Sequence, residues 1–162
     1  EEGSFFPYMT AEEYGFFLTR FFDSFDLTKY HKLLNFFEIE TNAKLRTMSK
    51  GQKAKVETAA GFSKGADIIL MDEPFSGKDM VTRKEFLKLI NTSLRTNETI
   101  LIATHLVDEI ENMLDRAIIL KYGRLIADFY MDEILEQGIS LSEKCLETGG
   151  YDSVRFKELL KV

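Results

Sequence analysis

The chain has 162 residues, a formal net charge of −6 at pH 7 and 44% hydrophobic residues. This length allows one compact domain or two small subdomains with a core, and the acidic balance argues against a nucleic-acid-binding surface. Cys145 is the single cysteine, no apolar run approaches the roughly 20 residues of a membrane span, and no secretory signal is visible. These features predict a soluble intracellular protein.

The first third of the chain is predicted to be helical. Thr10 and Glu13 have the spacing of a capping box, and Thr28 can start a second helix. Residues 39–47 are expected to form a loop, and Ser49 with Gln52 forms a second box that opens a helix ending near residue 64. Aromatic and apolar side chains follow the first box at helical spacing: Tyr14, Phe17, Leu18, Phe21, Phe22 and Phe25. This stripe either packs into a core or forms an exposed patch that docks a partner.

The middle of the chain has the pattern of a parallel α/β unit. Ile68–Met71 and Thr99–Ala103 are short apolar runs typical of buried strands. Thr82 and Glu85 can open the helix between them. The order strand, helix, strand predicts a parallel sheet covered on both faces.

The last part of the chain predicts a hairpin and short helices. Residues 117–120 and 125–127 flank a turn at 122–124. Helical pieces are expected at 132–137 and 153–161, with a hinge at Gly149-Gly150. We therefore expect three parts: a helical subdomain over 1–65, an α/β part over 66–138 and a tail over 139–162.

Polar side chains with catalytic potential follow both predicted strands. Asp72 and Glu73 end the first strand and His105 ends the second. Ligands of open α/β sheets bind beyond the carboxyl ends of parallel strands, so two carboxylates and an imidazole there can hold a metal ion and activate a water molecule. Two plain alternatives stay open: a polar strand exit at Asp72-Glu73-Pro74, and a His105 that only caps the next helix.

The segment Ser49-Lys50-Gly51-Gln52 also has two interpretations. In one, Ser49 caps a helix and the Gln52 side chain bonds back to the Ser49 backbone N–H. In the other, a hydroxyl, a glycine and backbone N–H groups at a helix N-terminus form an anion site. The two interpretations require the same local geometry, so residue spacing does not distinguish a helix cap from an anion site.

Four motifs in one order give the chain a specific resemblance. They are MSKGQ (48–52), IILMDEP (68–74), FSGKD (75–79) and ATH (103–105). This series resembles the signature, Walker B, D-loop and switch-histidine motifs of the ATP-binding subunit of ABC transporters, in an exporter-like form. The resemblance implies an α/β fold in which a helical subdomain precedes the Walker B half of a P-loop NTPase parallel sheet, followed by a hairpin and short helices.

The resemblance also identifies a motif that this sequence lacks. The chain contains no G-x-x-x-x-G-K-[ST] phosphate loop, and Glu1 stands where the family has the glutamine of its Gln loop. The sequence thus resembles the C-terminal portion of a larger ATPase. Because the phosphate loop supplies most contacts to the β- and γ-phosphates, we expect this chain alone not to hydrolyse ATP.

Roles are carried over only to matching positions. The resemblance implies that Asp72 holds Mg²⁺ through water, with Glu1 nearby, and that Glu73 orients or deprotonates the attacking water. His105 contacts the γ-phosphate of ATP. The signature segment faces the nucleotide of an opposite subunit, and the D-loop lies at that dimer interface. The residues of these two segments are Ser49, Lys50, Gly51 and Gln52, and Ser76, Gly77 and Asp79.

Three further departures from the family pattern, besides Glu1, are visible. Met48 replaces a leucine, Lys50 replaces a glycine of the signature, and Lys78 replaces the usual leucine of the D-loop. Lys50 adds positive charge near a phosphate and need not harm binding, whereas the charge of Glu1 would repel phosphate.

The resemblance implies two partners, a transmembrane permease subunit and a second ATPase subunit, and a cytoplasmic location on the inner face of the membrane. Two alternatives remain: an ABC-type ATPase outside transport, and a non-catalytic module that docks a membrane partner. In the family, the phosphate-loop strand lies beside the strand that ends at His105. A chain without that neighbour exposes the edge of strand 99–103 and is expected to self-associate.

Overall fold

A computed structural model describes residues 6–75, 78, 80–93 and 98–149. The chain forms two compact units, one made of Glu1–Met71 with Ser93–Ile102 and the other of Asp72–Thr92 with Ala103–Val162. Unit 1 carries the predicted signature segment, and unit 2 carries the predicted catalytic pair.

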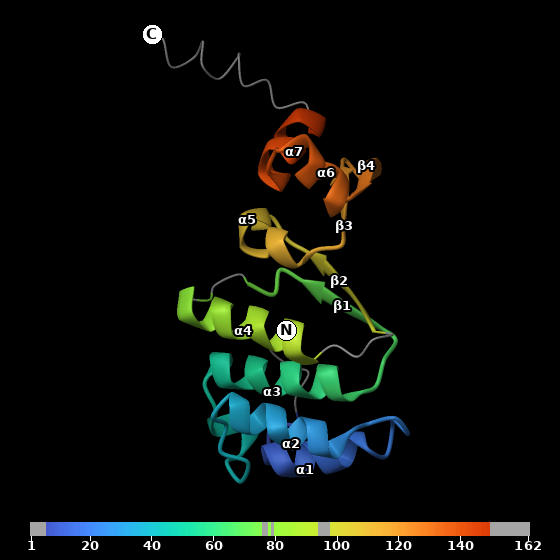
Figure 1. The fold of residues 1–162 in the computed structure, drawn as a ribbon. Coiled ribbons are helices and arrows are strands. Elements are labelled where there is room, and N and C mark those ends of the chain that lie inside the picture. Colours follow the sequence, from blue (N-terminus) through green and yellow to red (C-terminus); the bar gives the residue numbers. More distant parts are fainter. Residues whose placement is uncertain (1–5, 76–77, 79, 94–97, 150–162) are drawn as a thin grey trace. The chain divides into compact units, whose positions relative to one another are not determined.

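Unit 1 is built on three helices: α1 (Ala11–Leu18), α2 (Leu27–Phe36) and α3 (Lys50–Ser63). They lie side by side (Figure 1), and a short 3-10 helix (Leu45–Thr47) precedes α3. The predicted capping boxes of α1 and α3 are both confirmed. α2 begins earlier than expected, because Asp26 rather than Thr28 caps it by accepting a hydrogen bond from the Lys29 N–H at 2.8 Å.

The first helix is shorter than its aromatic stripe predicts. α1 ends at Leu18, and Phe21, Phe22 and Phe25 follow it in an irregular segment that contains turns. The chain turns here because it is tied to the end of α3: the Ser24 hydroxyl donates to the Lys64 carbonyl at 2.6 Å, and the Asp26 N–H donates to the Ser63 carbonyl at 2.8 Å. Tertiary hydrogen bonds therefore override the helical spacing.

The core of unit 1 centres on Tyr30. Its side chain is fully buried and its hydroxyl donates to the Ala11 carbonyl at 2.9 Å. Gly15 lies directly against this ring, since a Cβ there would come within 2.5 Å of Tyr30 Cε1. Fully buried neighbours complete the core, among them Leu34, Leu45, Val56 and Phe62.

The predicted strands form a two-stranded sheet, β1 (Ile68–Asp72) and β2 (Thr99–Ala103). The Thr99 N–H donates to the Asp67 carbonyl, and the Glu73 N–H donates to the Ala103 carbonyl, each at 2.8 Å. The first bond joins the starts of the two strands and the second joins their ends. The strands therefore run parallel, as predicted. The expected cover on both faces is wrong for this chain, because Ile68, Leu70 and Leu101 alternate along one face and are exposed.

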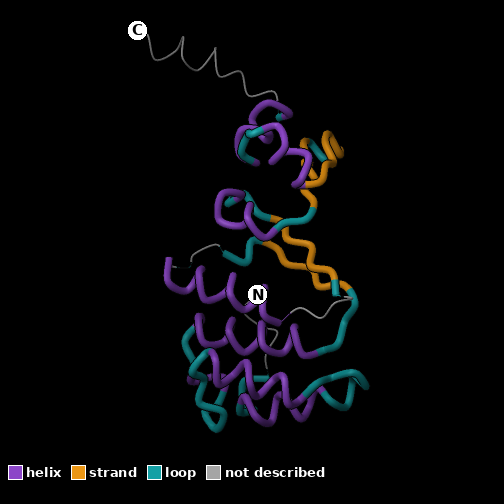
Figure 2. The backbone as a smooth tube through the Cα atoms, in the orientation of Figure 1, coloured by secondary structure: helices purple, strands orange, loops and turns teal. Residues whose placement is uncertain are grey.

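Unit 2 contains α4 up to Thr92, a short α5 (Val107–Ile110) and a 3-10 turn (Glu111–Met113). α4 (Met80–Ser93) begins before Thr82, two residues earlier than the sequence predicts. The expected hairpin is confirmed as β3 (Arg116–Lys121) and β4 (Arg124–Tyr130), which pair antiparallel with a register shift between Ile119 and Leu120. In the described part of the chain, the strands, drawn in orange in Figure 2, come after the helices α1 to α3 in the sequence.

Two helices close unit 2. α6 (Met131–Gln137) is confirmed and ends at Gly138, whose φ is 68°. α7 (Leu141–Thr148) is not predicted from the sequence, although Ser140 and Glu143 give it a complete capping box. The core here comprises Phe129, Met131, Ile134 and Leu141. Gly149 follows α7, whereas Gly150 and the predicted helix 153–161 lie outside the described residues.

Within the described part of the chain, no helix is long and apolar enough to cross a membrane.

Candidate functional site

Glu73 stands directly after β1 in an uncommon backbone conformation. Its backbone φ is 44°, a value that residues other than glycine and asparagine rarely adopt. Its N–H donates to the Ala103 carbonyl at the end of β2, so the pairing of the two strands holds the residue there. Strain of this kind concentrates at functional sites, and it places the Glu73 carboxylate beside the residues that follow β2.

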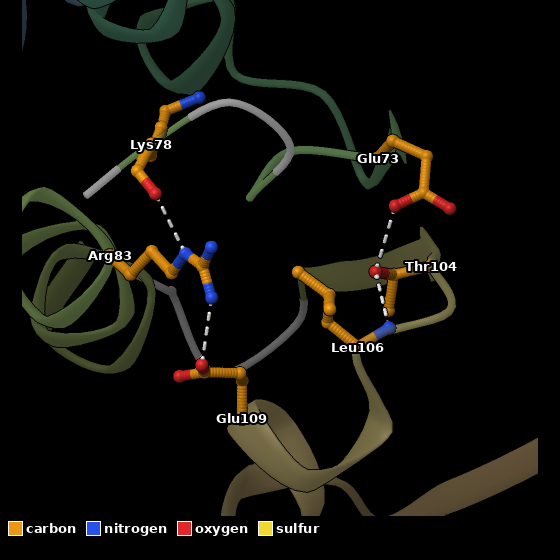
Figure 3. Close-up of polar contacts among 6 residues, drawn as sticks. All are labelled: Glu73, Lys78, Arg83, Thr104, Leu106 and Glu109. Carbon is orange, nitrogen blue, oxygen red and sulfur yellow. Dashed lines mark hydrogen bonds and ion pairs between the residues drawn. The ribbon is translucent and has the colours of Figure 1, made fainter. Parts of the chain in front are cut away.

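Three donors converge on that carboxylate. The Thr104 hydroxyl donates to Glu73 Oε2 at 3.0 Å (Figure 3), and the His105 N–H donates to Oε1 at 3.1 Å. His105 Nδ1 lies 2.7 Å from the same Oε1. The two residues predicted to be catalytic are therefore in direct contact.

The contact lowers the pKa of Glu73 below its ordinary value of 4.5. The hydrogen bond from His105 is the main cause and the Thr104 hydroxyl adds to it, while desolvation acts in the opposite direction. Glu73 is thus ionised at neutral pH and can only accept hydrogen bonds. His105 Nδ1 must then donate the proton of their hydrogen bond, and Nε2 stands at the opposite edge of the ring.

His105 does not cap the next helix. Leu106 is the N-cap of α5, and its N–H donates to the Thr104 hydroxyl at 3.1 Å. The His105 side chain is 71% exposed and that of Glu73 37%. The helix-capping alternative is therefore wrong, and the pair is accessible to a ligand.

Asp72 ends β1 and is exposed to solvent. Among the described residues, no three histidine, cysteine, aspartate or glutamate side chains are placed to hold a metal ion. A single exposed carboxylate suits Mg²⁺, which usually takes one or two protein carboxylates together with waters and substrate phosphates. Glu1, the other predicted metal residue, lies outside the described residues.

The signature segment forms the start of α3. The Ser49 hydroxyl accepts from the Gln52 N–H at 3.2 Å, and Gln52 Oε1 accepts from the Ser49 N–H at 2.9 Å. All four residues of the segment, with Lys50 and Gly51 between them, are exposed. A Cβ added to Gly51 would meet only Ser49 Oγ, at 3.9 Å. Neither packing nor backbone conformation therefore requires a glycine at this position.

Only part of the predicted D-loop is described, because Ser76, Gly77 and Asp79 lie outside the described residues. The Lys78 ammonium donates to the Pro74 carbonyl at 2.6 Å and lies 5.6 Å from the centroid of the Phe86 ring. Burial lowers the pKa of Lys78. The lysine that departs from the family pattern is therefore bound into the loop.

Sequence reasoning missed three residues at this site: Thr104, Arg83 and Glu109. The Arg83 side chain contacts Glu109 and the Lys78 carbonyl, as Figure 3 shows. Thr104 had a usable signal, since it is the residue between β2 and His105. Arg83 and Glu109 are 26 positions apart and had none.

Known proteins resemble the chain in sequence. No protein-family profile matches it. It is 34% identical over 125 residues to the ABC transporter ATP-binding protein YtrB of Bacillus subtilis, covering 76% of this chain and 43% of that protein. It is 34% identical over 98 residues to Nod factor export ATP-binding protein I of Neorhizobium galegae, covering 59% and 28%. The chain thus spans less than half the length of these curated relatives.

Solved structures resemble it in fold. An ATP binding subunit of an ABC transporter superimposes with a TM-score of 0.76 at 26% identity, over 90% of this chain and 64% of that one. A dimeric post-hydrolysis state of the ATP-binding cassette MJ0796 bound to ADP and Pi gives 0.64 at 22% identity, over 79% and 59%, a likeness of fold alone. The fold of this chain is therefore that of an ATP-binding cassette, which is a fold of the P-loop NTPase type.

Over the region that aligns, the homologues of this chain are ABC transporter ATP-binding proteins.

Proposed function

We propose that this chain is part of the ATP-hydrolysing subunit of an ABC transporter, which couples ATP binding and hydrolysis to transport across a membrane. One observation carries the proposal: Glu73 and His105, from the ends of adjacent parallel strands, meet at 2.7 Å. Homology to ABC transporter ATP-binding proteins gives that pair its chemical context. Phosphoryl transfer needs few covalent steps from a protein and depends on positioned charge.

The residues at the strand ends have different roles in ATP hydrolysis. Asp72 supplies an exposed carboxylate for Mg²⁺, which neutralises phosphate charge when bound; Glu1 is the second residue assigned to the ion. Glu73 orients the attacking water, since a carboxylate that stays ionised accepts hydrogen bonds from it. His105 shares its Nδ1 proton with Glu73 and presents Nε2 to the γ-phosphate.

The signature segment acts on the nucleotide of a second subunit. Ser49, Lys50, Gly51 and Gln52 are exposed at a helix N-terminus, where N–H groups and the helix dipole favour an anion. Gly51 supports this role, because a glycine that packing does not require lets a phosphate approach the backbone. Ser76, Gly77 and Asp79 are assigned to the dimer interface. The fold likeness to a dimeric ATP-binding cassette is consistent with such a pair.

The membrane partner is a permease subunit, which places the protein on the cytoplasmic face of the membrane. Aromatic side chains of unit 1 support a docking role: Tyr8, Phe16 and Phe21 are exposed by 72%, 52% and 65%. Exposed aromatic residues of this size are a frequent feature of partner surfaces. The name of one relative, a Nod factor export protein, favours export.

The proposal is tested by phosphate release from the full-length subunit that we propose contains this sequence, with and without its permease. The wild type should hydrolyse ATP, faster with the permease. Glu73→Gln should bind ATP, accumulate as a dimer and nearly stop hydrolysis, because binding does not need the water-orienting acid.

Two outcomes contradict the proposal. Turnover of Glu73→Gln close to the wild-type rate would refute the role of Glu73. A rate of ATP hydrolysis that is the same with and without the permease would favour an ABC-type ATPase outside transport. The 162-residue chain alone serves as a control and should release no phosphate above background, since its sequence has no phosphate loop.

A further inference from the structure

Glu73 and His105 begin two segments of unit 2 that meet a second time. One segment runs from Glu73 through Pro74 and Lys78 to α4, and the other runs from His105 into α5. Arg83 of α4 and Glu109 of α5 form an ion pair, with guanidinium NH1 2.9 Å from Glu109 Oε1. The chain segments and the two contacts therefore form a closed ring, which Figure 3 shows in part.

The Arg83 guanidinium also holds the loop that follows Glu73. Its Nε donates to the Lys78 carbonyl at 2.9 Å. Lys78 in turn bonds back toward Glu73: its N–H donates to the Phe75 carbonyl at 3.3 Å and its ammonium to the Pro74 carbonyl at 2.6 Å. These hydrogen bonds connect Arg83 through Lys78 to Pro74, the neighbour of Glu73.

Phe75, two residues after Glu73, is anchored by packing. The Phe75 side chain is fully buried and contacts the Phe86 ring edge to face, with centroids 5.7 Å apart. The side chains of Arg83 and Glu109 are 27% and 35% exposed. Ion pairs of such exposure contribute little to the free energy of unfolding. A role for this pair is therefore sought in the positions of the two segments that it connects.

We propose that Arg83 and Glu109 are positioning residues that keep Glu73 in contact with Thr104 and His105. Arg83 fixes the loop after Glu73, and Glu109 fixes the helix after His105. The role in hydrolysis rests on the function proposed above, whereas the physical coupling does not. Breaking the ion pair should loosen the contacts of Glu73 while the hairpin of the same unit stays intact.

Amide hydrogen exchange on the 162-residue chain tests the coupling. The reporters are the N–H of His105, which donates to Glu73, and that of Leu106, which donates to Thr104. Arg83→Gln should accelerate exchange at both by about threefold or more, as expected for a local opening, and leave the amides of β3 and β4 unchanged. Glu109→Ala should do the same. In the double variant the effect should not exceed that of either single one, because paired residues are not additive.

Two further variants sharpen the test. Glu109→Gln keeps an oxygen acceptor for Arg83 and should show a smaller acceleration than Glu109→Ala. Arg116→Gln is the matched control, since it breaks another arginine–carboxylate pair of unit 2, with Asp128, and should leave His105 and Leu106 unaffected. Unchanged exchange in Arg83→Gln, additive single effects, or an equal effect of Arg116→Gln would each overturn the proposal.

Steady-state kinetics of the full-length subunit test the role in hydrolysis. Arg83→Gln should lower kcat by about tenfold while KM for ATP stays within about twofold, as for a group that matters in the transition state. Faster exchange with an unchanged kcat would retain the coupling and reject the role in hydrolysis. A wild-type subunit without turnover would reject the proposed function, and the exchange experiment would still decide the coupling.

Discussion

Two helical glycines of unit 1 have opposite steric surroundings. A Cβ on Gly15 would lie 2.5 Å from the Tyr30 ring, whereas one on Gly61 meets no described atom within 4 Å. Gly15→Ala should therefore lower the free energy of unfolding by about 1–3 kcal/mol through overpacking. Gly61→Ala should raise it by about 0.5–1 kcal/mol, because alanine favours the helix. Urea denaturation of both variants checks this, and equal effects would contradict the packing of α1 on α2.

Thr104 is a residue whose hydroxyl serves two neighbours. It donates to Glu73 and accepts from the Leu106 N–H. Thr104→Val keeps the shape and removes both bonds, so it should cost about 1 kcal/mol of stability and expose the Leu106 amide to exchange. Thr104→Ser keeps the hydroxyl and is the matched control. If both variants exchange at the same rate as the wild type, the hydroxyl does not anchor this turn.

The β3–β4 hairpin carries a pH-sensitive pair. The Arg116 guanidinium donates to both Asp128 oxygens, at 2.7 and 2.6 Å, and lies 5.3 Å from the Tyr130 ring centroid. Hydrogen bonding to Arg116 holds the pKa of Asp128 below its ordinary 3.8. A lowered carboxyl pKa stabilises the folded state fully above the unfolded pKa, and this contribution is lost as the pH falls through the folded pKa.

An NMR titration of the Asp128 carboxyl checks this pair. The midpoint should lie below 3.8 in the wild type and return toward 3.8 in Arg116→Gln. The acid sensitivity of the hairpin should vanish in Asp128→Asn, which carries no titrating group. A midpoint that is equal in the wild type and in Arg116→Gln would contradict the ion pair.

For the whole molecule, the exposed apolar face of the β1–β2 sheet has a consequence in solution. Ile68, Leu70 and Leu101 are exposed by 62%, 72% and 54%. Exposed apolar area and open strand edges both favour association, so the chain should self-associate with rising concentration. Leu70→Thr with Leu101→Thr should weaken this association. Leu135→Thr, on α6, is the control for an exposed leucine elsewhere.

Sedimentation across a concentration series measures the effect. A wild type that stays monomeric at high concentration would show that something covers the sheet face. An equal effect of the Leu135 variant would show that association is a general property of exposed leucines.

The sequence by itself determined the features that depend on local patterns. The capping boxes at Thr10 and Ser49 predicted two helix starts, because a box is complete within four residues. Alternation and turn residues located the hairpin. The motif order placed Glu73 and His105 at the ends of adjacent strands, since parallel strands end at one edge of a sheet.

Other features were decided only by the tertiary structure. α1 stops at Leu18 because the following segment bonds to the end of α3, 40 residues away. One face of the sheet is exposed, which apolar strand composition alone does not reveal. Arg83 and Glu109 meet because two helices of unit 2 approach each other, and neither residue has a local neighbour that indicates its partner. Contacts between distant segments depend on how elements pack, which short-range sequence patterns do not encode.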